Sequence, residues 1–363
     1  MGFARYVAIG DSQTEGLLDP DGRGGYRGWA DRLAGHLAAD NPHLAYANLA
    51  VRGKLLAAIR AEQLEPALQQ QPDLVTVMGG LNDLLRPGFD PGIATGHLDA
   101  MLAAIRAAGA TPVTNTFPPI EQITPLLRRL APRVTAFNAG IRAASERHGA
   151  VLVDFAQHPG TADPRIWSPD RIHANPVGHA LIAAAFADAL GLPGHDAWSE
   201  PLPRLPQPRL ARRIGTEARW LGGTVVPWLA RRARGRSSGH GITAKRPRLL
   251  PVAPVYHLVA PEEWPGAGEY RPASLAAEGF VHLSFADQVL GSANRHFRHA
   301  GELVAVQLDP VAIGAEIRIE DSYGSGAAFP HAYGPLPVSA ATGRHRLRRD
   351  DTGQWTAGKP FAT

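Results

Sequence analysis

The chain contains no cysteine, which excludes disulfides, thiolate metal sites and cysteine nucleophiles. It also has no uninterrupted apolar run of the roughly 18 residues that a membrane-spanning helix needs. The sequence starts with Met-Gly-Phe-Ala-Arg and enters a strand-like run at once, which leaves no room for a signal peptide. We therefore expect a cytoplasmic protein, and the missing cysteines fit a reducing compartment.

Charged residues are also scarce. They make up 19% of the 363 residues while apolar residues make up 44%, so the composition favours folded cores over wholesale disorder. A chain of this length predicts two domains. The net charge of +4 is unevenly distributed, because positions 201–250 hold twelve Lys/Arg residues and one acid, and this segment thus carries +11 and the remainder −7.

Strand-like and helix-like patterns alternate through the first 200 residues. The expected strands are Tyr6–Ile9, Ala45–Ala50, Leu74–Met78, Thr111–Thr116 and Val151–Phe155. The expected helices are Trp29–Asp40, Leu55–Gln70, Leu98–Ala108, Pro125–His148 and Pro176–Leu190. This alternation predicts a parallel sheet with helices on both faces. Five strands in this length favour a flavodoxin-like three-layer α/β/α fold.

A different pattern begins near residue 251. Strands are expected at Val255–Val259, Phe280–Leu283, Leu303–Leu308 and Glu316–Ile319, with one substantial helix at Ala286–His299. We therefore predict an α/β domain at 1–200, a basic Pro/Arg-rich extension or linker at 201–250, and a small α+β domain at 251–363.

A Gly-Asp-Ser turn follows the first expected strand and contains Ser12. In an open parallel sheet, ligands bind at the carboxyl ends of the strands. A serine at this position lies near a helix N-terminus, whose partial positive charge favours a developing anion. Taken alone, the tripeptide is more typical of an ordinary loop.

Asp170 and His173 lie three residues apart in Ser-Pro-Asp-Arg-Ile-His. On one helical turn this spacing brings both side chains to the same side. Asp170 would then hold one imidazole nitrogen and leave the other free to accept the proton of Ser12, as in a nucleophile, base and orienting acid. Taken alone, such a pair is more often a surface pair or a helix start.

Two further positions could stabilise an oxyanion. Asn82, in Gly-Leu-Asn-Asp at 80–83, follows the strand Leu74–Met78 and carries a two-donor amide. Gly53 follows the strand Ala45–Ala50, and its backbone N–H could approach a substrate oxygen with no Cβ in the way. The alternatives are a helix N-cap for Asn82 or Asp83 and an ordinary loop for Gly53.

Together these four blocks resemble the signature of SGNH (GDSL-type) hydrolases, in the family's order. The resemblance implies Ser12 as nucleophile, His173 as base and Asp170 as orienting acid. It also implies an oxyanion hole made of Ser12 N–H, Gly53 N–H and Asn82. The implied activity is hydrolysis of an ester or thioester through an acyl-serine, without metal or cofactor. Because family members act on acetylated sugars, lipids, thioesters and small esters, the acyl and alcohol groups stay unassigned.

In the basic segment, a dense run of Arg and Lys residues from Arg231 to Arg248 follows an apolar stretch. Two short amphipathic helices are expected in this segment, at Glu217–Leu221 and Val225–Arg232. It resembles a C-terminal extension of actinobacterial SGNH members. The run could lie on an anionic membrane surface or contact phosphates. Its short apolar stretch and the lack of a nucleic-acid motif favour a solubilising tail that packs on the acidic catalytic domain. The G-x-S-x-G match at 235–239 lacks the strand and helix of a nucleophile elbow.

The region 256–345 resembles an uncharacterised bacterial family whose fold is thought to be ADP-ribosyltransferase-like. The matching pieces are Tyr256-His257-Leu258, the segments 279–284 and 329–334, and Glu320-Asp321. The resemblance implies that His257 holds the ribose of NAD and Glu320 assists transfer, with His282 and Ser284 lining the cleft. The alternative is a buried His257 satisfied by a backbone carbonyl. Two rival functions follow: an NAD-dependent C-terminal domain with an accessory hydrolase domain, or a non-catalytic module that binds through the basic run.

Overall fold

The structure is a computed structural model, and it describes residues 2–123, 125–200, 202 and 239–362. These residues form two compact units. The first unit comprises the described residues of 3–37 and 47–248, and the second comprises those of 38–46 and 249–362.

Among the described residues, a six-stranded sheet that lies mostly in the first unit has the order β5-β4-β3-β1-β2-β6. β1 pairs in parallel with β3, β3 with β4, and β4 with β5. Without β6, this is the flavodoxin-like order 2-1-3-4-5 that the sequence predicts. The strands are β1 (Arg5–Gly10), β2 (Ala45–Asn48), β3 (Leu74–Met78), β4 (Thr111–Asn115), β5 (Val151–Val153) and β6 (Arg246–Pro251).

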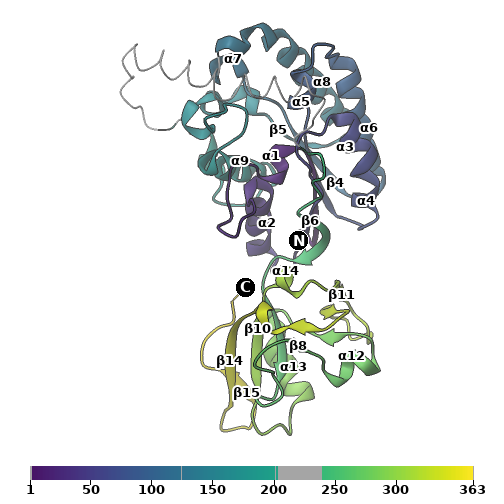
Figure 1. Cartoon of the computed structure of the whole chain (residues 1–363), viewed down its shortest axis with the longest axis vertical. Helices are drawn as coiled ribbons and strands as arrows, with labels where there is room; N and C mark the ends of the chain where they lie inside the picture. The colour runs from purple at the N-terminus through teal and green to yellow at the C-terminus, as the bar shows by residue number, and fades with distance from the viewer. Residues whose placement is uncertain (1, 124, 201, 203–238, 363) are drawn as a thin grey trace. The chain divides into compact units, whose positions relative to one another are not determined.

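Helices cover both faces of this sheet. Figure 1 shows α3, α4, α6 and α8 together on one side and α2 and α9 on the other. The rings of Trp29 on α2 and Phe186 on α9 stack with their centroids 4.3 Å apart. The expected three-layer fold is therefore confirmed. The helices are α1 (Ser12–Glu15), α2 (Gly28–Asp40), α3 (Leu56–Glu62), α4 (Leu64–Leu68), α5 (Leu81–Leu84), α6 (Pro91–Ala107), α7 (Ile120–Ile123), α8 (Ala131–His148) and α9 (Pro176–Ala189).

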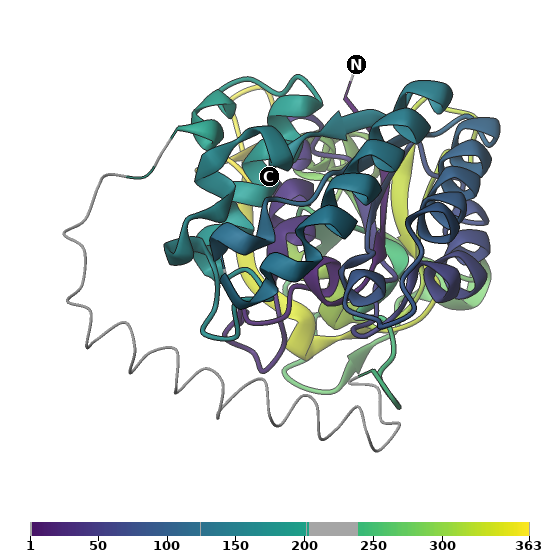
Figure 2. The ribbon, with the colours of Figure 1, turned by 90° about the horizontal axis from the view of Figure 1, so that it is seen from above.

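Two helix predictions were wrong in extent, because proline interrupts both segments. The expected helix Leu55–Gln70 is split into α3 and α4. Pro66, in the first turn of α4, has no backbone N–H, so it cannot donate the hydrogen bond that would continue α3 into α4. The expected helix Pro125–His148 consists of the 3₁₀ helix η1 (Pro125–Leu130) and α8, which has a proline in its first turn. Figure 2, a view from above, shows the segments that follow β4 and β5, coloured blue-green to teal, in front of the purple β1.

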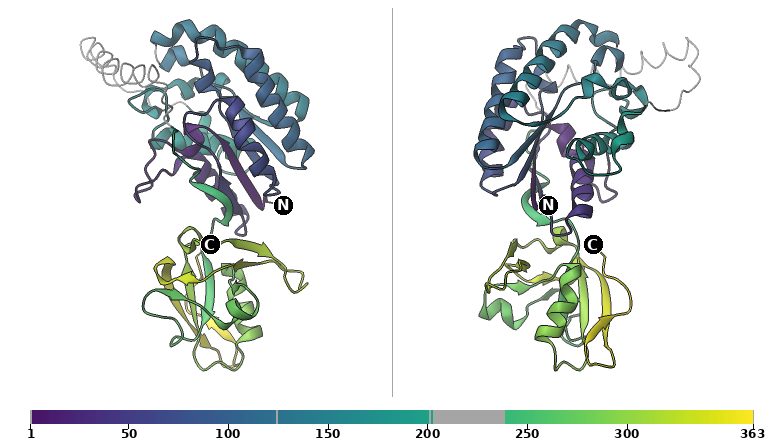
Figure 3. Two further views of the ribbon diagram at one scale, coloured as in Figure 1. Left: turned by 45° about the vertical axis from the view of Figure 1, so that its right-hand side comes forward. Right: turned by 180° about the vertical axis from the view of Figure 1, so that it is seen from behind.

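The second unit contains three small sheets within its described residues: β15-β14-β10-β7, β11-β12-β9 and β13-β8. Helix α13 packs against β7 and β15 of the four-stranded sheet (Figure 3). A small α+β domain is therefore confirmed. Its strands are β7 (Val255–Val259), β8 (Glu269–Tyr270), β9 (Val281–His282), β10 (Val304–Leu308), β11 (Ile317–Glu320), β12 (Phe329–Ala332), β13 (Leu336–Pro337), β14 (Ala341–Arg349) and β15 (Trp355–Ala357). Its α-helices are α12 (Ala273–Ala277), α13 (Val289–His296) and α14 (Pro310–Ile313).

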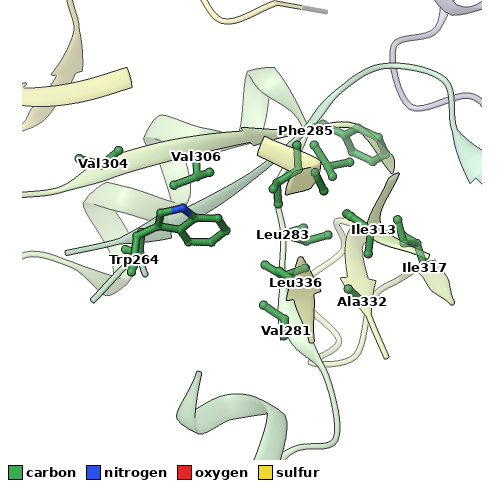
Figure 4. Close-up of a cluster of buried hydrophobic side chains, with 14 residues drawn as sticks. Trp264, Val281, Leu283, Phe285, Val304, Val306, Ile313, Ile317, Ala332 and Leu336 are labelled. Carbon is green, nitrogen blue, oxygen red and sulfur yellow. The ribbon is translucent and has the colours of Figure 1, made fainter. Parts of the chain in front are cut away.

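The core of the second unit gathers apolar side chains from different sheets (Figure 4). Phe285 and Val306 are fully buried there, and each such side chain contributes roughly 1.5–3 kcal/mol by leaving water. The expected helix Ala286–His299 is shorter than predicted: it begins as the 3₁₀ helix η7 (Ala286–Gln288) and its α-helical part ends at His296.

The basic extension lies mostly outside the described residues, including the two expected helices, the run Arg231–Arg236 and the G-x-S-x-G match up to Ser238. Its described end belongs to the first unit's sheet as β6. Just before β6, Lys245 Nζ lies 2.9 Å from Asp31 Oδ1 and donates to the Arg27 carbonyl at 2.6 Å. Strand β6 thus crosses the predicted boundary at residue 250. The membrane and phosphate hypotheses for the run stay predictions.

Candidate active site

The nucleophile candidate Ser12 is the first residue of α1, directly after β1. A Cβ on Gly10 would lie 2.2 Å from the Met78 carbonyl oxygen of β3, so the strand end requires glycine. Asp11 caps α1, and its carboxylate accepts a hydrogen bond from Gln13 N at 3.1 Å. Because the first N–H groups of a helix have no partner within it, the Ser12 N–H is one of the groups that α1 leaves without an intrahelical acceptor.

The Asp170–His173 pair does not lie on a helical turn, and this part of the prediction was wrong. The pair lies on a turn closed by a bridge between Trp167 and Ala174. Arg171 inside the turn has φ 58°, in the left-handed region that a helix cannot contain. The Asp170 carboxylate accepts the backbone N–H groups of both Ile172 and His173 at 3.0 Å, which fixes the turn around it.

This turn nevertheless brings the three predicted side chains into one hydrogen-bonded chain. Asp170 Oδ2 lies 2.6 Å from His173 Nδ1, and His173 Nε2 lies 2.8 Å from Ser12 Oγ. Burial opposes the ionisation of Asp170, but the hydrogen bond and charge of His173 outweigh it and hold the pKa of the Asp170 carboxyl below its ordinary value. An ionised Asp170 favours the tautomer with a proton on Nδ1, which leaves Nε2 free to accept the Ser12 proton.

Gln13 connects the serine helix to the histidine turn, and the sequence analysis missed it. Its amide nitrogen donates to the Ile172 carbonyl at 2.9 Å, and its amide oxygen accepts from Ala174 N at 3.2 Å. The two contacts therefore clamp the backbone on either side of His173. No local sequence signal marks this role, because the partners lie about 160 positions away along the chain.

Asn82 lies within α5, not at its N-cap, which is Gly80. The φ of Gly80 is 116°, and a Cβ there would lie 2.7 Å from the Phe137 ring. Asn82 Nδ2 donates to Asp11 Oδ2 at 3.2 Å and to the Lys54 carbonyl at 3.1 Å. The amide is thus held beside the residue that precedes Ser12. Burial raises the pKa of the Asp11 carboxyl to about 6, against the opposing effect of its hydrogen bonds.

Gly53 lies in a turn after β2 with φ 76°, a left-handed conformation that favours glycine. The preceding Arg52 fixes this turn to α1: its backbone N–H donates to Glu15 Oε2 at 2.8 Å and its Nε donates to Oε1 at 2.9 Å. Ser12, Gly53 and Asn82 therefore follow β1, β2 and β3, three neighbouring strands of one sheet.

The four candidates of the second unit each have hydrogen-bond partners of their own or a buried environment. His257 on β7 is buried, and its Nδ1 bonds the His282 carbonyl at 2.8 Å, as the carbonyl-satisfied alternative predicted. Its Nε2 is buried without a hydrogen-bond partner, and burial lowers the pKa of the His257 imidazole to about 4. Ser284 Oγ donates to Ser292 Oγ at 3.2 Å. Glu320 instead accepts from Tyr333 Oη at 2.6 Å.

Two histidine–glutamate pairs have their histidines on neighbouring strands of the three-stranded sheet. His282 on β9 faces His331 on β12 in the strand register. His282 Nε2 lies 3.2 Å from Glu278 Oε1, and His331 Nδ1 lies 3.1 Å from Glu320 Oε1. His331 belongs to the matching piece at 329–334 but was not among the predicted site residues.

The described residues contain no cluster of three or more His, Cys, Asp or Glu side chains arranged to hold a metal ion. In the same part of the chain, no helix is long and apolar enough to cross a membrane.

Comparisons with known proteins find separate similarities for two parts of the chain. Residues 8–181 match the model of the GDSL-like Lipase/Acylhydrolase family. An acetylxylan esterase from Geobacillus stearothermophilus is 27% identical over 212 residues, which cover 52% of this chain and 94% of that protein. The crystal structure of LAE5, an alpha/beta hydrolase enzyme from the metagenome of Lake Arreo, Spain, is 27% identical with a TM-score of 0.46, and the match covers 52% of this chain and 95% of that one.

Residues 258–343 match a family described as "Protein of unknown function (DUF952)". The crystal structure of protein CC0527 from Caulobacter crescentus is 34% identical with a TM-score of 0.26, and the match covers 28% of this chain and 93% of that one. These findings give no support to an ADP-ribosyltransferase fold, and NAD binding stays a prediction of the sequence. The first half of the chain is thus similar to GDSL-like hydrolases and to an acetylxylan esterase.

Proposed function

We propose that the N-terminal domain hydrolyses a carboxylic ester or thioester through an acyl intermediate on Ser12. The proposal is supported above all by the hydrogen bonds from Asp170 through His173 to Ser12, at 2.6 and 2.8 Å. Homology to GDSL-like enzymes and to an acetylxylan esterase supports the same reaction class.

In the proposed reaction, Ser12 Oγ attacks the acyl carbon while His173 Nε2 accepts the hydroxyl proton. The carbonyl oxygen becomes an oxyanion, which Ser12 N–H, Gly53 N–H and the Asn82 amide stabilise. His173 then passes the proton to the leaving alcohol or thiol, and Asp170 stabilises the transient imidazolium. In the second half, His173 accepts a proton from water, whose oxygen attacks the acyl carbon. The imidazolium then returns this proton to Ser12 Oγ as the bond between the acyl carbon and Oγ breaks, which releases the acid and restores the Ser12 hydroxyl.

The test compares wild type with Ser12→Ala on p-nitrophenyl butyrate. We expect kcat to fall about 10³-fold or more in the variant. Ser199→Ala is the matched control, since Ser199 is bonded only locally, to the Asp196 carbonyl at 3.4 Å, and it should keep wild-type activity. Equal hydrolysis by wild type and Ser12→Ala would contradict the proposal.

A second measurement applies if the wild type does not hydrolyse p-nitrophenyl butyrate. A fluorophosphonate probe forms a covalent bond with an activated serine, so mass spectrometry should find one adduct on the peptide that contains Ser12, and none after His173→Ala. No adduct on the folded wild type would overturn the proposal. Because these side chains supply every proposed step, we also expect dialysis against EDTA to leave the rate unchanged.

A further inference from the structure

A hollow of the first unit is lined by α2 and α9, which cover the same side of the sheet (Figure 1). Its volume is about 420 Å³, within the range typical of small-molecule sites. Its described lining residues are Arg27, Arg32, Gly35, His36, Ala180, Ala184 and His195. None of the residues proposed for ester hydrolysis is among them, so the hollow needs an explanation of its own.

The spacing of the lining residues explains how the hollow forms. Arg32, Gly35 and His36 recur three and four positions apart on α2, so they share one face of this helix. Ala180 and Ala184 lie four positions apart and share a face of α9. Glycine and alanine fill little space, and a Cβ on Gly35 would have no atom of another element within 4 Å. The small residues therefore leave room between the basic side chains.

Two arginines of the wall can donate hydrogen bonds to a ligand. Asp19 fixes the orientation of Arg32, since Nε donates to Oδ2 and Nη2 donates to Oδ1, both at 3.0 Å. Arg27, which precedes α2, is exposed. Within the described part of the chain, neither Nη1 of Arg32 nor the Arg27 guanidinium has a hydrogen-bond partner. Guanidinium groups match phosphate oxygens in geometry and charge, so both arginines suit an oxyanion.

Two histidines complete the basic wall. The ring centroids of His36 and of His195, which precedes the 3₁₀ helix η5 (Asp196–Ser199), lie 4.3 Å apart. Burial, followed by the charges of His195 and the two arginines, lowers the pKa of the His36 imidazole. A negatively charged ligand would offset the repulsion among these groups and favour the protonated ring.

Acidic residues on the same elements do not neutralise this basic wall. Asp31 on α2 pairs with Lys245 at 2.9 Å, and Asp188 on α9 accepts a hydrogen bond from a tryptophan N–H at 2.9 Å. Asp196, at the start of η5, is exposed, and none of these three acids lines the hollow. Among the described residues, Asp19 is thus the one acid that pairs with a basic group of the wall.

We propose that this hollow binds a small organic phosphate, a phosphomonoester whose doubly negative head group lies among the two arginines and the two histidines. The arginines donate to the phosphate oxygens, and the positive charge of the wall selects a dianion over a monoanion. A volume of about 420 Å³ also leaves room for an organic group beside the phosphate. The site is separate from the proposed catalysis at Ser12 and does not depend on it. Inorganic phosphate carries the same head group, and the binding experiment distinguishes the two sources.

Isothermal titration calorimetry of the full chain at pH 7 and constant ionic strength compares three probes. We expect one phenyl phosphate to bind per chain, at least about tenfold more tightly than benzoate, which has the same ring but a single negative charge. Inorganic phosphate should bind more weakly than phenyl phosphate, and equal binding would overturn the organic ligand. Ser12→Ala should bind phenyl phosphate as wild type does, whereas loss of binding in this variant would place the probe at Ser12. That result, or no saturable binding to wild type, would overturn the inference.

Arg27→Gln tests the contact with the head group. The affinity for phenyl phosphate should fall at least about tenfold, because one charged donor is lost. Arg60→Gln on α3 is the matched control: Arg60 is also exposed and its loss changes the net charge equally, but it does not line the hollow, so its affinity should match wild type. Equal losses in the two variants would mean a non-specific charge effect and would overturn the inference.

Ala180→Trp tests the location without a change of charge. The indole should fill part of the hollow and lower the affinity for phenyl phosphate at least about tenfold. Val177→Trp is the control, since Val177 also lies on α9 and is 55% exposed, but it does not line the hollow. Circular dichroism melting selects variants that fold. If neither Arg27→Gln nor Ala180→Trp weakens binding, the probe lies elsewhere and the inference is overturned.

Nuclear magnetic resonance of the histidine rings gives a readout that a change in folding alone would not produce. Saturating phenyl phosphate should raise the pKa of the His36 imidazole, because the dianion stabilises the protonated ring. His36→Gln identifies the resonance by its loss. A His36 titration that is the same with and without phenyl phosphate would overturn the proposed position of the head group.

Discussion

The side-chain nitrogen of Asn82 lies 3.2 Å from a carboxylate oxygen of Asp11, the residue that precedes the proposed nucleophile. The same nitrogen donates to the Lys54 carbonyl at 3.1 Å, so both of its hydrogens are committed and the amide plane is fixed. To donate to an oxyanion, the Asn82 amide must exchange one of these two acceptors for the new oxygen, so the two bonds hold the amide beside Ser12 and one of them gives way when the oxyanion forms.

Replacing Asn82 with Ala should therefore lower kcat by about 10²- to 10³-fold, with a much smaller change in KM. The physical reason is the loss of one oxyanion donor, which acts in the transition state more than in substrate binding. Steady-state kinetics on the best ester measure the effect. Asn82→Gln keeps a donor and should retain more activity than Ala. An Ala variant that folds and keeps wild-type kcat would remove Asn82 from the proposed oxyanion hole.

Asp170→Asn should lower kcat by about 10⁴-fold while the fold is retained. The carboxylate accepts the Nδ1 proton of His173 at 2.6 Å, whereas an Asn amide can donate there and would favour the wrong imidazole tautomer. The assay is the p-nitrophenyl ester hydrolysis used for Ser12→Ala. Asp163→Asn serves as the control. The Asp163 carboxylate pairs with the Arg165 guanidinium at 2.6 Å and is not part of the hydrogen-bonded chain from Asp170 to Ser12. A loss below tenfold in the Asp170 variant would argue against its orienting role.

Gln13→Leu should lower kcat by about 10²-fold, since small displacements of a catalytic group carry costs of that size. Leucine fills similar space but removes both hydrogen bonds that clamp the backbone around His173. The split between kcat and KM, with the melting temperature, distinguishes a displaced base from general unfolding. A variant with a lower melting temperature and an unchanged kcat would reduce Gln13 to a structural role.

The residues with local sequence signals were the ones that could be predicted. Buried strands such as Leu74–Met78 are nearly continuous apolar runs, and the structure has this strand with the same bounds. Ser12, Gly53 and Asn82 follow three such strands, so their convergence could be inferred from the parallel sheet alone. Gln13 could not be found in this way, because its role depends on contacts with a turn that only the tertiary fold brings near.

The turn around Asp170 and His173 shows where spacing alone misleads. A separation of three residues suits one helical turn, but Pro169 and Pro176 flank the pair, and a residue before proline avoids the helical region. In the second unit, β14 went unpredicted because its sequence Ala-Thr-Gly-Arg-His-Arg-Leu-Arg-Arg has mostly exposed, charged positions and little apolar alternation. Its strand conformation comes from pairing with β10 and β15.

Asp11 should make folding stability depend on pH in the opposite sense to a typical surface carboxylate. Burial raises the pKa of Asp11 from 3.8 to about 6. The folded state thus holds the proton more tightly, so this contribution is complete below pH 4 and is lost as the pH rises through 6. Urea unfolding of wild type and Asp11→Asn should show the variant gaining about 3 kcal/mol relative to wild type between pH 4 and pH 7. A difference that stays constant over this range would contradict the buried, proton-binding Asp11.

His179 should act in the reverse direction over nearly the same range. Burial lowers the pKa of the His179 imidazole from 6.5 to about 4, while Nδ1 accepts from Trp29 N at 3.2 Å and Nε2 donates to the Leu17 carbonyl at 3.1 Å. The neutral ring is therefore required, and its contribution is complete above pH 6.5 and lost as the pH falls through 4.

In unfolding experiments, wild type should lose about 3 kcal/mol relative to His179→Gln between pH 7 and pH 4. Because Asp11 and His179 change stability in opposite directions over the same interval, their effects nearly cancel in wild type, and a flat wild-type profile would conceal both. Only the single variants separate the two effects. Asp11→Asn removes the contribution that stabilises the folded state at low pH, and His179→Gln removes the contribution that destabilises it there. A His179→Gln profile parallel to wild type would mean that the ring is protonated at an ordinary pH in the folded state.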